Sequence, residues 1–278
     1  MFLVYRVKLK MRYFSASLQK KIVEKIQCSS HILLLLDYDG TLSPIVSTPQ
    51  EARLKSSTQT VLKALTKNSR FTIGIITGRS VQQIKRLLGL KKVIIGGNHG
   101  LQLWSPKLKD RYNLAEGFKY RIKEMKQELK PLQEKFPGSF LEDKKISLAY
   151  HYRLTNPSLY SRIKTEFFER IDPWVKGQKI HVLEIKKGWE VLPPILWDKG
   201  KAVKWILARH PKETFPIFIG DDVTDESAFK ALASKGVSIR VGRKKSSAAQ
   251  YFLKNVPEVE KFLVTLANTG KQQFQIGS

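Results

Sequence analysis

The chain has 278 residues, enough for one large domain or two modest ones. Hydrophobic residues make up 42% of it, so a buried core can form and a fully disordered chain is excluded. There are 50 Lys and Arg against 24 Asp and Glu, a formal net charge of +26. Such a charge favours an anionic substrate or a nucleic acid. The cations are spread along the whole chain without zinc-finger spacing or an RNA-binding aromatic pattern, so nucleic acid is the less favoured partner.

The composition also bears on location and on redox chemistry. No apolar run approaches the roughly 18 to 20 residues that cross a bilayer, so we expect no membrane association. Residues 1–14 mix basic and apolar side chains but lack the apolar core and cleavage site of a secretory signal. We expect an irregular extension of a cytoplasmic protein, with a basic targeting sequence as the alternative. The single cysteine, Cys28, excludes an intrachain disulfide, and we expect a buried or half-buried thiol without a catalytic role.

Strand-like and helix-like segments alternate in the first part of the chain. Residues 32–36 form a short, continuous apolar run, which is typical of a parallel strand buried on both faces. The other predicted strands are 71–79 and 92–100, and the predicted helices are 17–26, 58–66 and 80–88. This order predicts an α/β sheet wound with right-handed crossovers.

The pattern changes after about residue 107 and returns near residue 198. Between these points lie a predicted charged helix at 118–135, an alternating strand at 146–154, a helix at 157–171 and two short strands within 179–193. The α/β pattern then resumes, with helices at 202–208, 226–233 and after Pro257 and strands starting at 215 and 237. We therefore predict a Rossmann-like core of residues 1–107 and 196–278, interrupted by an α+β cap of residues 108–195.

Acidic and hydroxyl side chains follow three of the predicted core strands. Asp37 and Asp39 lie in DYDGT, Thr77 lies in TGR, and GDDVTDE brings Asp221, Asp222 and Asp225. Sites of open parallel sheets lie beyond the carboxyl ends of the strands, so these groups can converge. Each acid alone could be a helix cap, but together they favour catalysis.

These segments resemble a known group of enzymes. LLLLDYDGTL, IITGR, Lys199 within WDKG, and IGDDVTDESAF are similar to the four motifs of the haloacid dehalogenase superfamily. DYDGTLSPI, GNHG, HYR, EVLPPILWDKG and GDDVTDESAF together resemble the trehalose-6-phosphate phosphatase family. The resemblance implies a mostly parallel haloacid dehalogenase core with a cap inserted between the second and third motifs. One position departs from the family, because Leu192 stands where an Arg is common.

The resemblance implies a phosphatase that uses an aspartate nucleophile. Asp37 would attack phosphorus to form an aspartyl-phosphate. Asp39 would protonate the leaving sugar oxygen and later accept a proton from water. The Thr77 hydroxyl and the Lys199 ammonium would hold the other phosphate oxygens.

The same resemblance implies a Mg²⁺ cofactor. Its ligands would be the Asp37 side chain, the backbone carbonyl of Asp39 and the Asp221 side chain. Asp222 or Asp225 would orient the metal-bound waters.

For the sugar, the candidates are Asn98 and His99 on the core and Arg153, Lys187 and Glu190 on the cap, because long cations and a carboxylate can satisfy several hydroxyls. The alternatives are that His99 is structural and that residues 186–188 are only a charged hairpin turn.

The expected reaction is therefore hydrolysis of trehalose 6-phosphate to trehalose and phosphate. One alternative keeps the chemistry and changes the substrate to sucrose phosphate or mannosyl-phosphoglycerate, and the missing Arg at Leu192 leaves it open. Another is a basic nucleic-acid-binding protein on a degenerate phosphatase fold. The resemblance also allows a non-covalent partnership with a trehalose-phosphate synthase.

Overall fold

The computed structural model describes residues 11–106 and 112–269. Most of the expected N-terminal extension and the first predicted domain boundary, at 107/108, therefore lie outside the described residues. Across the described ranges, no helix is both long and apolar enough to cross a membrane.

In the part of the chain that the structure describes, the larger of two sheets has nine strands. In spatial order they are β1 (Arg12–Tyr13), β13 (Tyr251–Leu253), β12 (Val237–Val241), β11 (Phe215–Gly220), β2 (Ile32–Leu36), β3 (Phe71–Ile76), β4 (Val93–Gly97), β5 (Gln102–Trp104) and β6 (Tyr112–Asn113). All neighbours from β1 to β4 are parallel, and only β5 and β6 pair antiparallel. The predicted parallel α/β sheet is confirmed.

Strand β2 shows that this sheet is covered on both faces. Its alternate residues Ile32, Leu34 and Leu36 belong to one apolar cluster, and Leu33 and Leu35 belong to another. The first cluster includes side chains of α1 (Ala16–Gln27), α2 (Ser56–Lys67), α3 (Val81–Leu88) and α8 (Val256–Thr269). The second includes side chains of α6 (Lys199–Leu207) and α7 (Glu226–Leu232). A strand with helices on both faces has no solvent side, which is why its sequence is continuously apolar.

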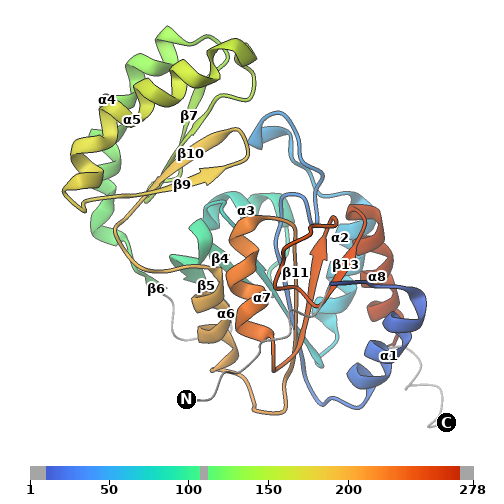
Figure 1. Cartoon of the computed structure of the whole chain (residues 1–278). Helices are drawn as coiled ribbons and strands as arrows, with labels where there is room; N and C mark the ends of the chain where they lie inside the picture. Colours follow the sequence, from blue (N-terminus) through green and yellow to red (C-terminus); the bar gives the residue numbers. More distant parts are fainter. Residues whose placement is uncertain (1–10, 107–111, 270–278) are drawn as a thin grey trace, which may run out of the picture.

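The smaller sheet is antiparallel and forms a separate lobe, coloured green to yellow in Figure 1. Its strands lie in the order β7 (Phe140–Asp143), β8 (Leu148–His151), β10 (Gly188–Leu192) and β9 (His181–Ile185). The helices of the lobe are α4 (Lys119–Lys135) and α5 (Tyr160–Lys176). All of these elements fall within the interval 108–195, although the domain boundaries themselves stay a prediction.

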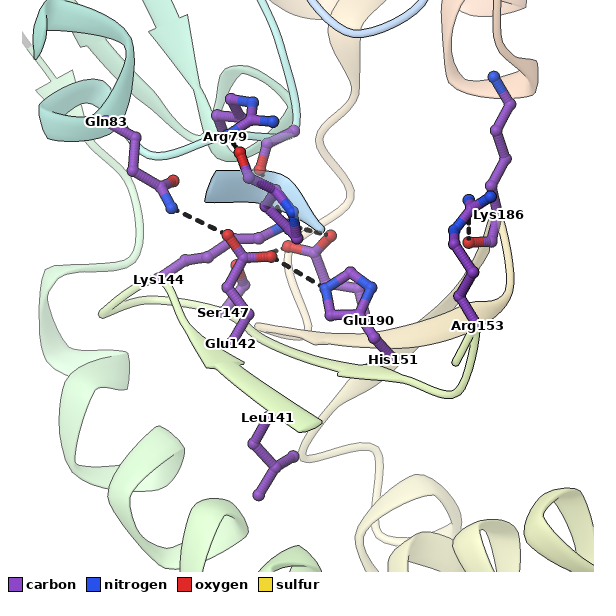
Figure 2. A network of polar contacts seen from close by, with 12 residues as sticks. Arg79, Gln83, Leu141, Glu142, Lys144, Ser147, His151, Arg153, Lys186 and Glu190 are labelled. Atoms are coloured by element: carbon purple, nitrogen blue, oxygen red, sulfur yellow. Dashed lines mark hydrogen bonds and ion pairs between the residues drawn. The ribbon is translucent and has the colours of Figure 1, made fainter. Parts of the chain in front are cut away.

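The two faces of the smaller sheet have different chemistry. Tyr150 and Trp189 join the apolar cluster formed with α4 and α5. The alternate residues His151 and Glu190 lie on the opposite face, which looks toward the larger sheet (Figure 2). Period-two alternation in β8 and β10 thus gives the lobe one apolar face for its own core and one polar face for a site.

Two expectations need correction. Cys28 is exposed rather than buried or half-buried, because it lies just beyond the last residue of α1, two residues past the buried Ile26. Helix α6 starts at Lys199, before the predicted residue 202, because the Asp198 side chain accepts a hydrogen bond from the Lys201 backbone and caps the helix earlier.

Candidate active site

Asp37 follows the last residue of β2, and its backbone N–H donates to the carbonyl of Ile219 in β11 at 2.8 Å. Its side chain is buried. Burial raises the pKa of Asp37 well above its ordinary value, opposed by Lys199 and reinforced by Asp225 and Asp221. A carboxylate at this position therefore depends on a nearby cation to stay ionised.

Lys199 supplies that cation. Its Nζ lies 3.0 Å from Oδ1 of Asp37 and 2.7 Å from Oδ1 of Asp225. Burial disfavours the ammonium, but Asp225 and Asp37 together raise the pKa of Lys199. The start of a helix is an unfavourable place for a cation, so these two carboxylates must offset both the helix dipole and the desolvation.

Three buried carboxylates gather beside this ammonium. The side chains of Asp37, Asp221 and Asp225 offer ligand oxygens within 4.8 Å of one another. One oxygen of Asp221, Oδ1, is buried and has no hydrogen-bond partner among the described residues. Gly40, at φ +81°, makes room for this carboxylate, because a Cβ there would lie 2.2 Å from Oδ2 of Asp221. An all-carboxylate cluster with an unsatisfied buried oxygen fits a hard divalent cation.

The cluster differs in membership from the sequence-based ligand set. Asp37 and Asp221 are shared, whereas the Asp225 side chain lies within the cluster instead of outside it. The Asp222 side chain is not part of the cluster, and its backbone N–H donates to Oδ2 of Asp225 at 2.8 Å. The Asp39 carbonyl as a ligand stays a prediction.

Arg240, in β12, supports the acidic loop from behind and was not predicted. Its guanidinium donates to the backbone carbonyls of Asp221 and Asp222 and to the Glu226 side chain. These bonds fix the backbone of the loop that carries the Asp221 and Asp225 carboxylates.

Asp39 is held by a second arginine. Arg79 donates from Nε and from Nη2 to the two carboxylate oxygens of Asp39, each at 2.7 Å. Its Nη1 donates to the carbonyl of Pro49 at 2.8 Å, so the guanidinium also ties down the loop that follows β2. The sequence reasoning used TGR only for Thr77 and missed Arg79.

Thr77 follows the last residue of β3 and is buried. Its hydroxyl accepts a hydrogen bond from the Arg79 backbone at 3.2 Å. Thr77 lines the same cleft as Asp37, Asp39 and Lys199, so the structure brings the four predicted catalytic side chains together.

The smaller lobe closes the other side of this cleft. Its lining residues there are Glu142, Lys144, His151, Arg153, Ile185, Lys186 and Glu190, and His99 joins them from the core. Three predicted sugar contacts, His99, Arg153 and Glu190, therefore reach the cleft. Asn98 does not line it, because its amide is fully buried against Gln102 and Ser147. The Lys187 ammonium lies over the Tyr160 ring, 4.4 Å from its centroid, and does not line the cleft.

Glu190 is the centre of a buried polar network that joins the lobe to the core. Its Oε2 contacts Nζ of Lys144 at 2.9 Å and Nε2 of His99 at 3.2 Å, and its Oε1 accepts from Ser147 at 2.6 Å. The Lys144 ammonium also donates to the carbonyl of Gly78 at 3.0 Å. Burial alone would raise the pKa of Glu190, but Lys144 and His99 hold it well below its ordinary value.

A second carboxylate, Glu142, makes a parallel connection. It accepts from Gln83 of α3 at 2.8 Å and contacts Nε2 of His151 at 2.9 Å (Figure 2). Burial opposes ionisation here too, yet Lys144 and these hydrogen bonds lower the pKa of Glu142 to about 2.

Comparison with known proteins agrees with this arrangement. A family model described as trehalose-phosphatase matches residues 35–257, which is most of the chain. The chain belongs to the trehalose-phosphatase family. It is 32% identical, over 91% of its own length and 72% of the relative's, to a probable trehalose-phosphate phosphatase J of Arabidopsis thaliana. Trehalose-phosphatases are phosphoric monoester hydrolases, so the chain is placed among enzymes.

Solved structures extend the agreement to the fold. The C-terminal domain of trehalose-6-phosphate phosphatase from C. albicans is 26% identical and superposes with a TM-score of 0.80, covering 93% of this chain and 99% of that one. A second structure, the C-terminal domain of a trehalose synthase regulatory protein of Candida albicans, shares the fold at 13% identity and a TM-score of 0.70, over 91% of this chain and 99% of that one. The predicted haloacid dehalogenase fold is confirmed.

The candidate site and the contacts that support it include five residues that were not predicted from the sequence: Arg79, Glu142, Lys144, Lys186 and Arg240. Arg79 could have been predicted from the sequence, because it stands in TGR two positions after Thr77. The LEDKK segment that holds Glu142 and Lys144 has no distinctive spacing. That Glu142 and Lys144 face the cleft becomes visible only when the lobe is placed against the core.

Proposed function

We propose that this chain hydrolyses trehalose 6-phosphate to trehalose and phosphate through an aspartyl-phosphate on Asp37. The proposal rests mainly on one observation. A buried strand-end carboxylate, Asp37, lies in contact with a buried ammonium, Lys199, and within one cluster with Asp221 and Asp225. Membership of the trehalose-phosphatase family supports the choice of substrate.

The first half of the reaction uses Asp37 and Asp39. A carboxylate oxygen of Asp37 bonds to phosphorus while the bond from phosphorus to the sugar oxygen breaks. Asp39 donates a proton to that oxygen, so trehalose leaves neutral. The Arg79 guanidinium holds the Asp39 carboxyl group in place for this transfer.

The second half regenerates the nucleophile. Water attacks phosphorus and gives a proton to Asp39, and the bond from phosphorus to Asp37 breaks to release phosphate. Thr77 and Lys199 line the cleft beside Asp37 and would bind the phosphate oxygens that do not react. Lys199 also keeps Asp37 ionised against the effect of burial.

A divalent cation would be held by Asp37, Asp221 and Asp225, and we propose Mg²⁺, because the cluster offers only hard oxygen ligands. When bound, such a cation neutralises phosphate charge and so lowers the barrier to attack by an anionic nucleophile. Asp222 would act from outside the cluster.

Sugar recognition is proposed for the polar face of the lobe. Arg153, Glu190 and His99 line the cleft together with Glu142 and Lys144. Hydroxyl-rich ligands are selected well by sites that combine carboxylates with long cations, since each unpaired group carries a penalty. Lys187 and Asn98 would contribute indirectly, through the hairpin turn and the core turn that they belong to.

Other substrates and partners have less support. The family match favours trehalose phosphate over sucrose phosphate and mannosyl-phosphoglycerate. The assembled acids and Lys199 disfavour a pure nucleic-acid-binding role. A non-covalent partnership with a trehalose-phosphate synthase remains part of the proposal, as does a cytoplasmic location.

The test is phosphate release from a panel of sugar phosphates in Mg²⁺, comparing the wild type with Asp37→Asn and with Asp172→Asn. Asp172 is the matched control, because it is a half-exposed aspartate on α5 that pairs with Lys176 outside the cleft. Asp37→Asn should lower the rate with trehalose 6-phosphate by at least about 1,000-fold. Preference for another sugar phosphate would change the substrate and keep the mechanism. Absence of release from every sugar phosphate would overturn the proposal.

A further inference from the structure

The hairpin between β9 and β10 carries two adjacent lysines whose side chains go in different directions. Lys187 stays within the lobe, over the ring of Tyr160. Lys186 leaves the lobe, and its Nζ lies 2.6 Å from Oδ2 of Asp221. Figure 2 shows its side chain extending away from the sheet of the lobe and toward the core. A residue of the lobe thus contacts a carboxylate of the metal cluster directly.

Hydrogen bonds and backbone conformation hold the turn that carries Lys186 in a fixed geometry. Arg153 donates from Nη2 to the Lys186 carbonyl at 3.1 Å, and the Tyr152 backbone donates to the Lys187 carbonyl at 3.0 Å. Lys187 has a left-handed backbone, φ +59°, which is uncommon for a residue with a side chain. These constraints fix the direction in which Lys186 leaves the turn.

The charges of the cluster explain what Lys186 does there. Lys199 is engaged by Asp37 and Asp225, which leaves Asp221 as the third carboxylate. Within the described ranges, Lys186 is the cation that contacts the Asp221 side chain. The Asp221 side chain is 7% exposed and the Lys186 side chain 41%, so a fixed, buried acid is paired with a cation on an accessible arm.

We propose that Lys186 and the divalent cation compete for Asp221, and that this competition couples metal binding to the position of the β9–β10 hairpin. The proposal rests on the proposed function in one respect, that Asp221 is a metal ligand. A divalent cation offers Asp221 a stronger partner than an ammonium and repels the ammonium. By linkage, Lys186 weakens metal binding by the same factor by which the metal weakens the hold of Lys186.

Release of Lys186 would free the tip of the hairpin and leave the lobe docked. The network of Glu190, Lys144 and Gly78, and the bond from Gln83 to Glu142, connect the lobe to the core without Lys186. Metal binding is therefore expected to open one edge of the cleft, beside Arg153, while the sugar-facing network stays assembled.

The first experiment measures Mn²⁺ binding by isothermal titration calorimetry on the full chain after treatment with a chelator. Lys186→Ala should bind Mn²⁺ about 3- to 10-fold more tightly than the wild type, a modest effect because the lysine is partly exposed. Lys187→Ala is the matched control, since it removes a neighbouring charge that does not reach Asp221, and its Kd should match the wild type. Lys186→Arg should stay close to the wild type, because it keeps the charge.

The second experiment measures hydrogen exchange in residues 181–192 with and without Mn²⁺. In the wild type, Mn²⁺ should speed exchange at the hairpin tip. In Lys186→Ala, exchange should already be fast and insensitive to Mn²⁺. Equal or weaker Mn²⁺ binding by Lys186→Ala, no Mn²⁺ binding by the wild type, or wild-type exchange that ignores Mn²⁺ would each overturn the inference. Neither readout depends on turnover, so an inactive chain could still support it and an active one could still refute it.

Discussion

At the scale of single residues, the site separates two aspartates that are two positions apart. Asp37 is buried and faces the Lys199 ammonium, whereas the Asp39 side chain is 40% exposed and faces a guanidinium. Their environments suit their proposed tasks, because a nucleophile must be held in line and an acid–base group must exchange protons with substrate and water. Arg79 then determines where the Asp39 carboxyl group lies.

Replacing Arg79 with lysine should therefore slow the chemical step. Lysine keeps the charge but cannot make the paired bonds of a guanidinium, so Asp39 loses its orientation. We expect kcat with trehalose 6-phosphate to fall about 10- to 100-fold, with little change in KM. The fall should be smaller with p-nitrophenyl phosphate, whose leaving group needs little help from an acid. Equal losses with both substrates would mean that Arg79 acts only on the stability of the site.

At the scale of elements, the turn after β2 lies directly against the acidic loop after β11. Gly40 leaves room for the Asp221 side chain from the loop after β11. Its backbone is left-handed, with φ +81°, a conformation that costs most residues with a side chain conformational energy but costs glycine little. The DxDGT pattern thus has a glycine for two reasons, the backbone conformation and the closeness of Asp221.

Two glycines separate these reasons experimentally. Gly40→Ala should suffer both backbone strain and a collision with Asp221, while Gly242→Ala should suffer strain alone, because Gly242 has φ +79° and open space around it. We expect Gly242→Ala to lose about 1 kcal/mol of unfolding free energy and Gly40→Ala about 2 kcal/mol or more. Gly40→Ala should also bind Mn²⁺ more weakly. Similar losses in urea denaturation, with unchanged Mn²⁺ binding, would show that the contact with Asp221 is unimportant.

Element prediction from the sequence succeeded where burial dictates the pattern. β2 and β11 are buried on both faces, so their apolar runs stand out, and the acids that follow them were found with them. The short strands β1, β5, β6, β7 and β13 were not predicted. They have two to four residues, too few for a period to emerge, and they exist because a neighbouring strand offers hydrogen bonds.

At the scale of the whole molecule, the site depends on how the lobe sits on the core. The four predicted catalytic side chains all come from the core: Asp37, Asp39 and Thr77 follow parallel strands that end at one edge of the larger sheet, and Lys199 reaches the same cleft from the start of α6. The contacts of Lys186 with Asp221 and of Lys144 with Gly78 join residues 35 and 66 positions apart. No local pattern encodes such pairs, which is why Lys186 was missed in favour of its neighbour Lys187.

The docking network also predicts how acid acts on the protein. The pKa of Glu142 is lowered to about 2 from an ordinary 4.5, and that of Glu190 is lowered as well. Groups with a depressed folded-state pKa stabilise the fold above their ordinary pKa and lose that contribution as pH falls through the folded value. The unfolding free energy of the wild type should therefore fall between pH 4.5 and about 2. Glu142→Gln should be less stable at pH 7, by on the order of 3 kcal/mol at most, and should fall less steeply in acid.

Urea denaturation at a series of pH values would measure both slopes. Glu169→Gln is the control, because Glu169 is an exposed carboxylate on α5 that makes no ion pair within the described part of the chain. Its acid slope should follow the wild type. If Glu142→Gln and the wild type instead kept a constant difference down to pH 2, the charge of Glu142 would not hold the lobe to the core. Convergence of the two curves in acid is the expected result, because protonation does to the wild type what the substitution has already done.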